Sequence, residues 1–448
     1  RKRAIFQQKT QRRASRRVRW MTASSAAGEK PAGSNLERIV AHVDTDNSPE
    51  ARSWAESAFC QPIGASLLAV CAMPQYRTAF IVTHCTFSMT NTTSPLWADS
   101  VRAARFEQWL DAIAERQKID PRKVDVASAD ASFRRYLRVR GLAGHPARIV
   151  MDAPPDKEDC RPFVRVAELM RDAGLHAPHV LEWDEASGFM LLTDLGHATM
   201  MSALDSTTPA NAQPLYVQAL DVLLPWQQAS RRGELPPYDE ALLRRELQLF
   251  PDWYLARHRQ VALTAEQQEV LGSAFDLIVR HNLAAPMVYV HRDFMPRNLM
   301  LPEQEGGGLG VLDFQDAVYG PVTYDIASLM RDAFISWDEE FVIDITVRYW
   351  ERARRTGLLD HEGWHSDFAS FYRACEWMGL QRHLKVAGIF ARLTLRDGKE
   401  KYLADAPRFI RYIRDTARRY RELWPLLRLI DAVEGDTDAV SGYAIGRV

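Results

Sequence analysis

The chain has 448 residues, of which 46% are hydrophobic, 26% charged and 10% aromatic. This composition excludes a collagen-like, a wholly disordered or a disulfide-scaffold protein, and the length is sufficient for two lobes with sizeable apolar cores. The formal net charge of −1, from 57 Lys and Arg against 58 Asp and Glu, argues against a protein that binds polyanions through its overall charge.

The first 88 residues differ in character from the rest. They carry 13 Lys and Arg against 6 Asp and Glu, and nine of the basic residues precede position 21. A Ser-, Ala- and Gly-rich stretch follows, and such a segment buries too little apolar surface to offset the entropy lost on ordering it. We therefore predict that residues 1–88 are disordered or lie upstream of a native start at Met89. Two alternatives remain, a mitochondrial transit peptide and a tail that binds nucleic acid.

No transmembrane helix is predicted in this segment, because its apolar run at residues 65–72 is too short to span a bilayer. After position 88 only Cys160 and Cys375 remain, and two cysteines indicate neither a disulfide framework nor a metal site. The expected location is therefore a reducing compartment, the cytoplasm.

Periodic segments after Met89 predict a small strand-rich part followed by a large helical part. Helical spacing of apolar residues marks residues 102–114 and 162–173, and β-prone runs mark residues 133–139, 148–151, 180–183 and 189–192. Beyond Gly196 helical periodicity dominates, apart from a strand-rich stretch between residues 288 and 314. This order predicts an α+β fold with two lobes, residues 89–195 and 196–448, and a cleft between them.

The strongest motif lies in the strand-rich stretch of the second lobe. His291-Arg292-Asp293 follow an apolar strand, and Asn298 comes five residues after Asp293. Two further strands, residues 299–301 and 310–312, flank a glycine-rich turn, and Asp313 follows the second strand. A hairpin of this kind returns Asp313 to the neighbourhood of Asn298, with Asp293 on the adjoining loop.

Phosphoryl transfer requires this set of side chains. One carboxylate orients or deprotonates the attacking hydroxyl group, while an amide and a second carboxylate hold Mg²⁺ against nucleotide phosphates. Each residue alone is more often a turn residue, since Asp and Asn are common in turns, but the combined spacing favours the catalytic interpretation. For His291 and Asp325 we predict structural support of the loop.

Longer strings around this motif resemble a known family. HRDFMPRNLM (residues 291–300) and GVLDFQDAVYGPVTYD (residues 310–325) are similar to the aminoglycoside phosphotransferase and choline kinase branch of the protein-kinase-like fold. Together with QRHLKVAGIFARL (381–393), ADASFRRYLRV (129–139) and MDAPP (151–155), they resemble the bacterial N-acetylmuramate/N-acetylglucosamine anomeric kinases of cell-wall recycling. The resemblance runs from about Trp97 to the C-terminal region and does not extend to the first 88 residues.

The resemblance implies an ATP-dependent kinase that uses Mg²⁺ and phosphorylates the anomeric hydroxyl group of an amino sugar. It implies that Asp293 is the catalytic base and that Asn298 and Asp313 are the Mg²⁺ ligands. It also implies a turn over the phosphates at Asp130, Ala131, Ser132, Phe133 and Arg134, and an inter-lobe hinge that reads adenine at Thr193, Asp194 and Leu195.

One departure from the family concerns the lysine of the V-A-I-K strand, which usually binds phosphate. Met151 occupies that position in this chain. Either a nearby arginine supplies the missing positive charge, or Mg²⁺ neutralises a larger share of the phosphate charge. The candidate arginines are Arg134, Arg135 and Arg138.

The sugar site is less clearly marked. Gln315 and Asp316 follow a predicted metal ligand, and Arg382 and His383 lie on the helical segment 372–393; all four are candidates for binding the polar groups of the sugar. Arg382 and His383 have an equally strong alternative as an exposed or core-satisfied pair on a helix. The aromatic residues of segment 246–258 are expected in the core instead of against a sugar ring.

Other functions remain open at this point. Within the same fold, the acceptor hydroxyl could belong to an aminoglycoside, choline or homoserine, and the −8 balance of residues 89–448 mildly favours a cationic substrate. A non-catalytic protein with a degraded kinase fold would also lack the lysine, but it would have little reason to keep Asp293, Asn298 and Asp313 together. The expected partners are ATP and a small amino sugar, with no nucleic acid and no membrane, and the expected state is a monomer.

Overall fold

The computed structural model describes Trp97, residues 99–129, 133–304, 306–361 and 363–435, and four short strands nearer the N-terminus. The chain divides into two units, Arg1–Ala98 and Asp99–Val448. The strands of the first unit form two antiparallel pairs, β1 (Trp20–Thr22) with β2 (Ile39–Ala41) and β3 (Leu68–Cys71) with β4 (Ile81–His84). The rest of the segment predicted to be disordered, and the predicted phosphate-binding residues Asp130, Ala131 and Ser132, lie outside the described residues.

The second unit begins with a helix and an antiparallel five-stranded sheet in the order β5-β6-β7-β9-β8. The elements of this lobe are α3 (Ser100–Gln117), β5 (Ile119–Ala129), β6 (Arg135–Gly141), β7 (Arg148–Asp152), α4 (Arg161–Asp172), β8 (Val180–Asp184) and β9 (Phe189–Thr193). Every helix and strand that the sequence predicts in this lobe is present. The sequence pattern misses β5, because Pro121 and several charged residues interrupt its apolar alternation, which an edge strand tolerates.

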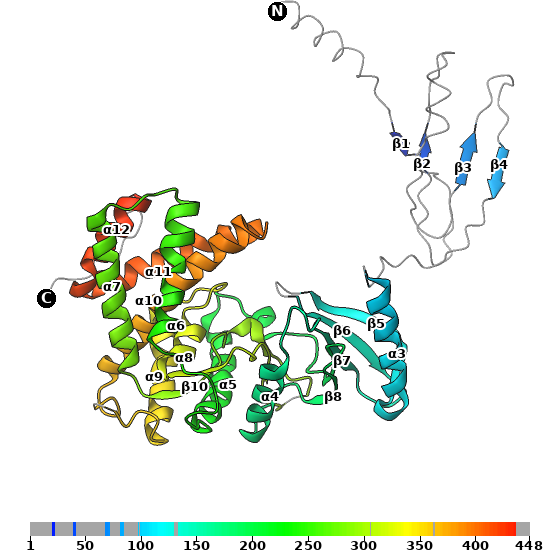
Figure 1. The fold of residues 1–448 in the computed structure, drawn as a ribbon, viewed down its shortest axis with the longest axis horizontal. Helices are drawn as coiled ribbons and strands as arrows, with labels where there is room; N and C mark the ends of the chain where they lie inside the picture. Colours follow the sequence, from blue (N-terminus) through cyan, green and yellow to red (C-terminus); the bar gives the residue numbers. More distant parts are fainter. Residues whose placement is uncertain are drawn as a thin grey trace, which may run out of the picture. The chain divides into compact units, whose positions relative to one another are not determined.

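The two faces of this sheet have different neighbours (Figure 1). Helix α3 covers one face, where the rings of Phe106 and Phe189 lie 5.5 Å apart. The opposite face carries Ile149 and Leu192, which line a cavity together with Phe163 of α4. This second face therefore forms one wall of the cleft between the lobes.

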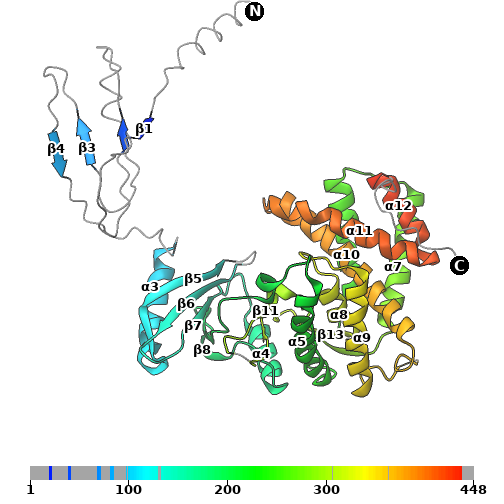
Figure 2. The same ribbon diagram turned by 180° about the vertical axis from the view of Figure 1, so that it is seen from behind.

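The C-terminal lobe is mainly helical (Figures 1 and 2). Its longer helices are α5 (Pro209–Gln228), α6 (Glu240–Leu247), the π-helix η2 (Phe250–His258), α7 (Ala265–Leu283), α8 (Thr323–Met330), α9 (Glu339–Arg355), α10 (Phe368–Leu395), α11 (Ala406–Arg419) and α12 (Trp424–Glu434). Its strands are β10 (Met287–Val290), β11 (Leu299–Met300), β12 (Gly310–Val311) and β13 (Val318–Pro321), and its short turns of 3₁₀ helix are η1 (Met200–Ala203), η3 (Pro296–Asn298), η4 (Glu400–Asp405) and η5 (Arg421–Leu423). Strand β10 pairs with β13, and β11 with β12, both antiparallel. The predicted α+β architecture of two lobes is confirmed.

Helix α10 forms the centre of this lobe. It extends the helical segment predicted at residues 372–393 to 28 residues, and it is buried along most of its length. Helices η2, α7, α8 and α11 pack around it. Phe250 and Tyr254 of η2 are buried, as predicted for the aromatic residues of this segment.

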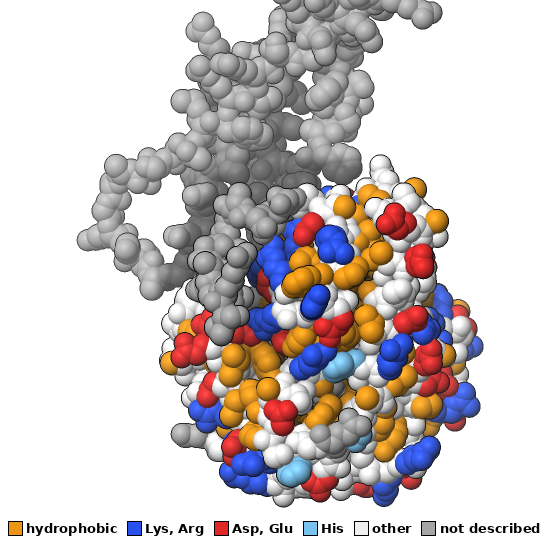
Figure 3. Space-filling view, turned by 90° about the vertical axis from the view of Figure 1, so that its left-hand side faces the viewer, with side chains coloured by type: hydrophobic (Ala, Val, Ile, Leu, Met, Phe, Trp, Pro, Cys, Tyr) orange, Lys and Arg blue, Asp and Glu red, His pale blue; other side chains and the backbone are white. Residues whose placement is uncertain are grey.

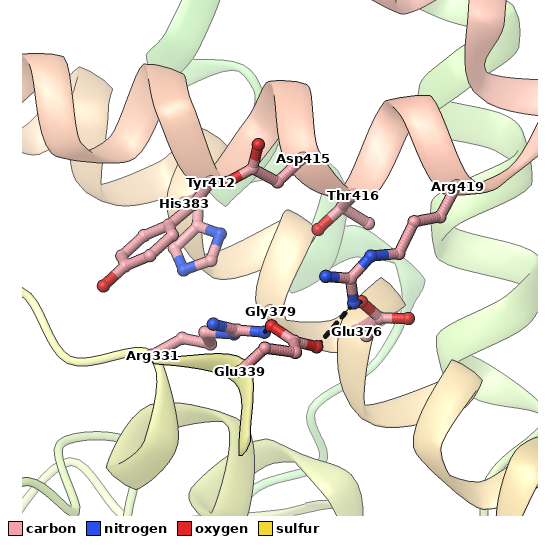
Figure 4. A pocket seen from close by; sticks show the side chains of 9 residues that line it. All are labelled: Arg331, Glu339, Glu376, Gly379, His383, Tyr412, Asp415, Thr416 and Arg419. Atoms are coloured by element: carbon pink, nitrogen blue, oxygen red, sulfur yellow. Dashed lines mark hydrogen bonds and ion pairs between the residues drawn. The ribbon is translucent and has the colours of Figure 1, made fainter. Parts of the chain in front are cut away.

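A cluster of charged side chains joins α10 to the ends of three other helices (Figure 4). Glu339, at the start of α9, pairs with Arg331 at 2.6 Å and with Arg419 of α11 at 2.7 Å. Arg419 also pairs with Glu376 of α10. Burial opposes the ionisation of Glu339, but Arg419 and Arg331 outweigh it and lower the pKa of this carboxyl group to about 2. Glu339 is therefore ionised at neutral pH and holds the ends of these helices together.

The surface of the described residues is mixed in charge. On the face shown in Figure 3, Lys and Arg side chains are interspersed with Asp and Glu, so the acidic balance of residues 89–448 is not gathered into one area there. No helix within the described part of the chain is both long enough and apolar enough to cross a membrane.

Candidate active site

The predicted catalytic residues lie close together after the end of strand β10. Asn298 directly precedes the β11–β12 hairpin, and Asp313 follows it. The hairpin pairs Leu299 with Val311 and so brings the chain back to Asn298. The Asn298 Nδ2 atom donates to the Asp293 carbonyl oxygen at 2.9 Å and to the Asp313 Oδ2 atom at 3.3 Å. The proximity that the sequence spacing predicts for these three residues is confirmed.

The backbone at two of these positions has an unusual conformation. Arg292 and Asp313 have φ angles of 75° and 63°, in the left-handed region that costs a non-glycine residue about 1–2 kcal/mol. The Asp325 carboxylate accepts from the backbone N–H groups of His291 at 2.7 Å and Arg292 at 3.0 Å. Burial raises the pKa of Asp325 to about 7, although these hydrogen bonds oppose the rise. Asp325 thus holds the loop in its strained conformation, and it does so from a fully buried position.

The His291 ring links the catalytic loop to the hairpin. Its Nε2 atom lies 3.0 Å from the Leu312 carbonyl oxygen, and its Nδ1 atom accepts from the Asp293 N–H group at 3.3 Å. The neutral ring with its proton on Nε2 satisfies both contacts. Burial lowers the pKa of His291 to about 4, so the ring is neutral at physiological pH. These are the contacts of a supporting residue.

An ion-pair cluster lies behind the same loop. The Arg292 Nη2 atom pairs with Glu246 Oε1 at 2.6 Å, and the Lys385 Nζ atom pairs with the same oxygen at 3.0 Å. Burial disfavours the ionised form of Glu246, but the two cations outweigh this effect and lower its pKa to about 2. The sequence assigns no role to Glu246 or Lys385, although Lys385 lies within the string QRHLKVAGIFARL, because only the fold brings α6 and α10 together.

The two candidate sugar ligands on α10 are buried. Arg382 is 5% exposed and His383 is 3% exposed. The Arg382 Nη1 atom donates to the Arg292 carbonyl oxygen at 2.6 Å, and its guanidinium carbon lies 4.8 Å from the centre of the Tyr324 ring. The His383 ring stacks on Tyr412 with 4.7 Å between ring centres. Arg382 is thus satisfied in the core and acts on the catalytic loop through its backbone. His383 is buried in the core as well, but neither ring nitrogen has a hydrogen-bond partner among the described residues.

A cavity of about 660 Å³ lies between the two lobes. Three groups of residues line it: the apolar side chains Ile149, Leu192 and Phe314, the predicted hinge residues Thr193, Asp194 and Leu195, and the predicted metal ligands Asn298 and Asp313. Ligand sites of this kind are apolar with a few convergent polar groups. The cavity therefore places a hydrophobic slot and the two predicted metal ligands in one continuous space.

The described part of the predicted phosphate-binding turn does not line this cavity. Phe133 is 62% exposed, and the Lys157 Nζ atom lies 5.0 Å from the centre of its ring. Arg134 pairs with Glu158 at 3.0 Å. The structure describes two side chains of the predicted turn, and both contact other residues of the N-terminal lobe.

The position of the usual phosphate-binding lysine is apolar in this protein. Met151 is fully buried within the hydrophobic core. Among the arginines predicted to compensate, Arg135 pairs with the buried Asp152 at 2.5 Å, and Arg138 pairs with Asp194 at 2.6 Å. Of these two, Arg138 lines the cavity.

Arg297 is a further cation of the cavity that the motif analysis does not single out. It directly precedes Asn298, is exposed, and lies with its guanidinium carbon 4.7 Å from the centre of the Phe334 ring. Arg297 and Phe334 both line the cavity. The signal that could have identified Arg297 is its place within the string HRDFMPRN, between the predicted base and the predicted metal ligand.

The residues around Asp313 fit a magnesium ion. Gln315 Nε2 donates to Asp313 Oδ1 at 2.9 Å, whereas the exposed Asp316 accepts from Arg292 Nη1 through its carbonyl oxygen at 3.3 Å. The described residues contain no group of three His, Cys, Asp or Glu side chains that could form an all-protein metal cage. Mg²⁺ prefers oxygen ligands and is often bound by one or two protein groups plus substrate phosphates, a set that Asn298 and Asp313 match.

Two lobes around a cleft, with an aspartate, an asparagine and a second aspartate brought together by a hairpin, define a phosphotransferase of the protein-kinase-like fold. Residues 123–358 match the model of the phosphotransferase enzyme family, and the chain belongs to this family. It is a small-molecule kinase.

Three relatives that are similar to this chain are each named N-acetylmuramate/N-acetylglucosamine kinase. The protein from Pseudomonas aeruginosa is 49% identical over 346 residues, covering 75% of this chain and 99% of the relative. The protein from Neisseria meningitidis serogroup B is 45% identical over 343 residues, covering 76% of this chain and 99% of the relative. The protein from Pseudomonas putida is 46% identical over 313 residues, covering 70% and 89%.

Solved structures with a similar fold are more distant in sequence. A choline kinase from Streptococcus pneumoniae matches with a TM-score of 0.47 and 13% identity, covering 70% of this chain and 99% of that chain. An ADP-bound aminoglycoside phosphotransferase matches with a TM-score of 0.45 and 14% identity, covering 68% and 97%.

Proposed function

We propose that this protein transfers the γ-phosphoryl group of ATP to the anomeric hydroxyl group of N-acetylmuramate or N-acetylglucosamine. The product is the sugar 1-phosphate, and the reaction would serve the recycling of peptidoglycan in the cytoplasm. The observation that carries the phosphoryl transfer is the convergence of Asp293, Asn298 and Asp313 beside the cleft cavity. The names of the relatives support the choice of acceptor.

In this proposal each part of the cavity has a separate role. The apolar slot and the hinge backbone at Thr193, Asp194 and Leu195 bind the adenine base. The Asn298 amide oxygen and the Asp313 carboxylate hold Mg²⁺, which neutralises charge on the phosphate oxygens when it is bound. The backbone amides of Ala131 and Ser132 are proposed to contact the phosphates.

Asp293 is the proposed base. A hemiacetal hydroxyl group is more acidic than an ordinary alcohol, so a carboxylate can accept its proton as the bond to phosphorus forms. The loop that carries Asp293 is held by Asp325, His291 and Arg382, which keeps the carboxylate in place without further movement.

The missing lysine is replaced, in this proposal, by Arg297. This guanidinium lines the cavity next to Asn298, whereas Arg138 is paired with Asp194 of the hinge. A guanidinium keeps its charge at all physiological pH values and binds phosphate in a bidentate manner.

A substrate panel tests the proposed function. The purified protein is incubated with ATP and Mg²⁺ and with N-acetylmuramate, N-acetylglucosamine, kanamycin, choline or homoserine, and ADP release is measured. Phosphorus NMR then locates the phosphate, since a sugar 1-phosphate couples to a single anomeric proton. Turnover of the amino sugars with phosphate on C1 is expected. Turnover of kanamycin, choline or homoserine without the amino sugars, or phosphate on another carbon, would refute the proposal.

A further inference from the structure

A second cavity adjoins the cleft cavity across the ring of Phe334. Its volume is about 430 Å³, and Phe334 lines both cavities. The segment Phe334, Ile335 and Ser336, which connects α8 to α9, forms one side, and the first turns of α11 form the other. The second cavity therefore shares with the first the Phe334 ring, on which Arg297 lies, but it lacks the hinge residues and the predicted metal ligands that line the first one.

The wall that α11 contributes is cationic. Arg408 and Arg411 line it, together with a single acidic residue, Asp405. Asp405 pairs with Arg408 at 3.5 Å, yet the Arg408 Nη1 atom is buried and has no hydrogen-bond partner among the described residues. The Nη1 atom faces the interior, where the Arg408 charge also acts on the buried Asp332 carboxylate. The Arg408 side chain as a whole is 23% exposed, so its guanidinium charge is also available to an anion in the cavity.

The second arginine faces a hydroxyl group across the cavity. The Arg411 Nη2 atom lies 3.5 Å from Ser336 Oγ, which also accepts from Tyr412 Oη at 2.6 Å. Arg411 is exposed, and its neighbour Tyr412 is buried. Arg408 and Arg411 are three residues apart on a helix, so their side chains project from the same face. The cavity thus offers two guanidinium groups and a hydroxyl group to one ligand.

We propose that this second cavity is a carboxylate subsite, in which Arg408 and Arg411 bind the lactyl carboxylate of N-acetylmuramate. The proposal rests on the proposed function and adds to it the residues that distinguish the two sugars. N-acetylmuramate differs from N-acetylglucosamine only by its lactyl ether, and guanidinium donors bind a carboxylate through charge-assisted, often bidentate hydrogen bonds. Nucleotide phosphates are a poorer match, because the proposed metal ligands and hinge line the other cavity.

The test compares the two sugars in the full-length protein. Steady-state kinetics are measured at saturating ATP for the wild type, Arg408→Gln and Arg411→Gln, and sugar binding is measured by calorimetry in parallel. Each substitution is expected to raise the KM and the dissociation constant for N-acetylmuramate by about 10- to 100-fold, as for the loss of a charge-assisted hydrogen bond. The values for N-acetylglucosamine are expected to stay within about twofold, which also shows that each variant is folded.

Two further variants sharpen the comparison. Arg411→Lys keeps the charge but not the bidentate geometry, so it is expected to restore part of the lost affinity for N-acetylmuramate. Arg428→Gln removes an exposed arginine of the neighbouring helix α12 and is expected to change neither sugar.

The outcomes separate this subsite from the function on which it rests. Equal losses for both sugars, or unchanged binding of N-acetylmuramate in both variants, would overturn the subsite while leaving the kinase assignment intact. If the wild type phosphorylates neither sugar, the proposed function is wrong. The calorimetric difference between the two sugars would then still decide whether Arg408 and Arg411 form a carboxylate site.

Discussion

The residues proposed for catalysis are held by the buried side chains Asp325, Arg382 and His291. Arg292 and Asp313 both adopt left-handed backbone conformations, and such strain persists only where the surroundings enforce it. Asp325 binds two backbone N–H groups of the loop, and Arg382 binds one of its carbonyl oxygens. The position of the Asp293 carboxylate is therefore set by several interactions at once.

Replacing Asp293 by asparagine tests its proposed role as the base. Asn keeps the size of the side chain but cannot accept the proton, so kcat for either amino sugar should fall by about 10²- to 10⁴-fold. Nucleotide affinity, measured by calorimetry with ADP, should stay nearly unchanged. Asp221→Asn on the exposed surface of α5 is the control and should retain wild-type kcat. A kcat that survives Asp293→Asn undiminished would show that another group is the base.

The half-buried His281 predicts a dependence of stability on pH. Burial lowers the pKa of His281 to about 4, and its ring stacks on Trp377 with 4.5 Å between centres. Because the folded-state pKa lies below the unfolded value of about 6.5, the unfolded chain binds the proton first, and stability is lost as the pH falls from about 6.5 to about 4.

The variant His281→Phe keeps the stacking and removes this titration. Other buried groups titrate in both proteins, so the difference between the two isolates His281. Between pH 7 and pH 5 the variant should lose about 1–2 kcal/mol less of its free energy of unfolding than the wild type, as measured by urea denaturation. Equal losses in the two proteins would show that folding does not lower the pKa of His281.

Helix α10 is the element that connects the core to the site. Its buried face supplies Lys385 to the ion-pair cluster behind the loop and Arg382 to the loop itself. At its C-terminal half the helix lies against the π-helix η2, where Gly388 allows the closest approach. A Cβ atom at Gly388 would lie 2.3 Å from the Leu249 carbonyl oxygen.

Two glycine substitutions in α10 test this packing. Gly388→Ala would push the backbone of α10 away from the backbone of Leu249. It should lower the free energy of unfolding by about 1–3 kcal/mol, as overpacking does in other cores. Gly379→Ala is the matched control, because its Cβ atom would meet only side-chain atoms, the nearest being His383 Cε1 at 3.6 Å. It should leave stability unchanged or raise it by up to about 1 kcal/mol, since alanine favours a helix over glycine. Thermal and urea unfolding of both variants measure the difference, and an equal effect at both positions would contradict the proposed contact.

At the scale of the whole chain, the proposed base Asp293, the proposed metal ligands Asn298 and Asp313 and the proposed carboxylate subsite all lie within the unit Asp99–Val448. The charge cluster around Glu339 and the core around α10 also lie entirely in this unit. We therefore propose that residues 89–448 carry the activity and that residues 1–88 take no part in it.

Deletion of residues 1–88 tests this division. The shortened protein should keep kcat and KM for both amino sugars within about twofold, because no proposed contact to ATP or sugar is removed. If the basic segment binds nucleic acid, the full-length protein should retain DNA or RNA in a salt-dependent manner and the shortened protein should not. A large loss of kcat in the shortened protein would show that the segment contributes to the kinase.

Local features of the sequence determined much of this protein. The helices and strands of the N-terminal lobe, the β11–β12 hairpin and the proximity of Asp293, Asn298 and Asp313 follow from periodicity, turn residues and spacing, which depend on nearby residues alone. Edge strand β5 escaped detection because proline and charged residues are tolerated at an edge and erase the usual alternation.

Tertiary packing decided the rest, since burial and long-range contacts depend on which helices meet. Only the folded chain shows that Arg382 and His383 are buried behind the catalytic loop, and that Glu246 of α6 meets Lys385 of α10. Only the fold brings Arg408 and Arg411 to a cavity that shares Phe334 with the cleft. The net charge of the whole chain, which is −1, likewise says little about a binding site. The charge of a site depends on the few charged side chains that the packing places around one cavity.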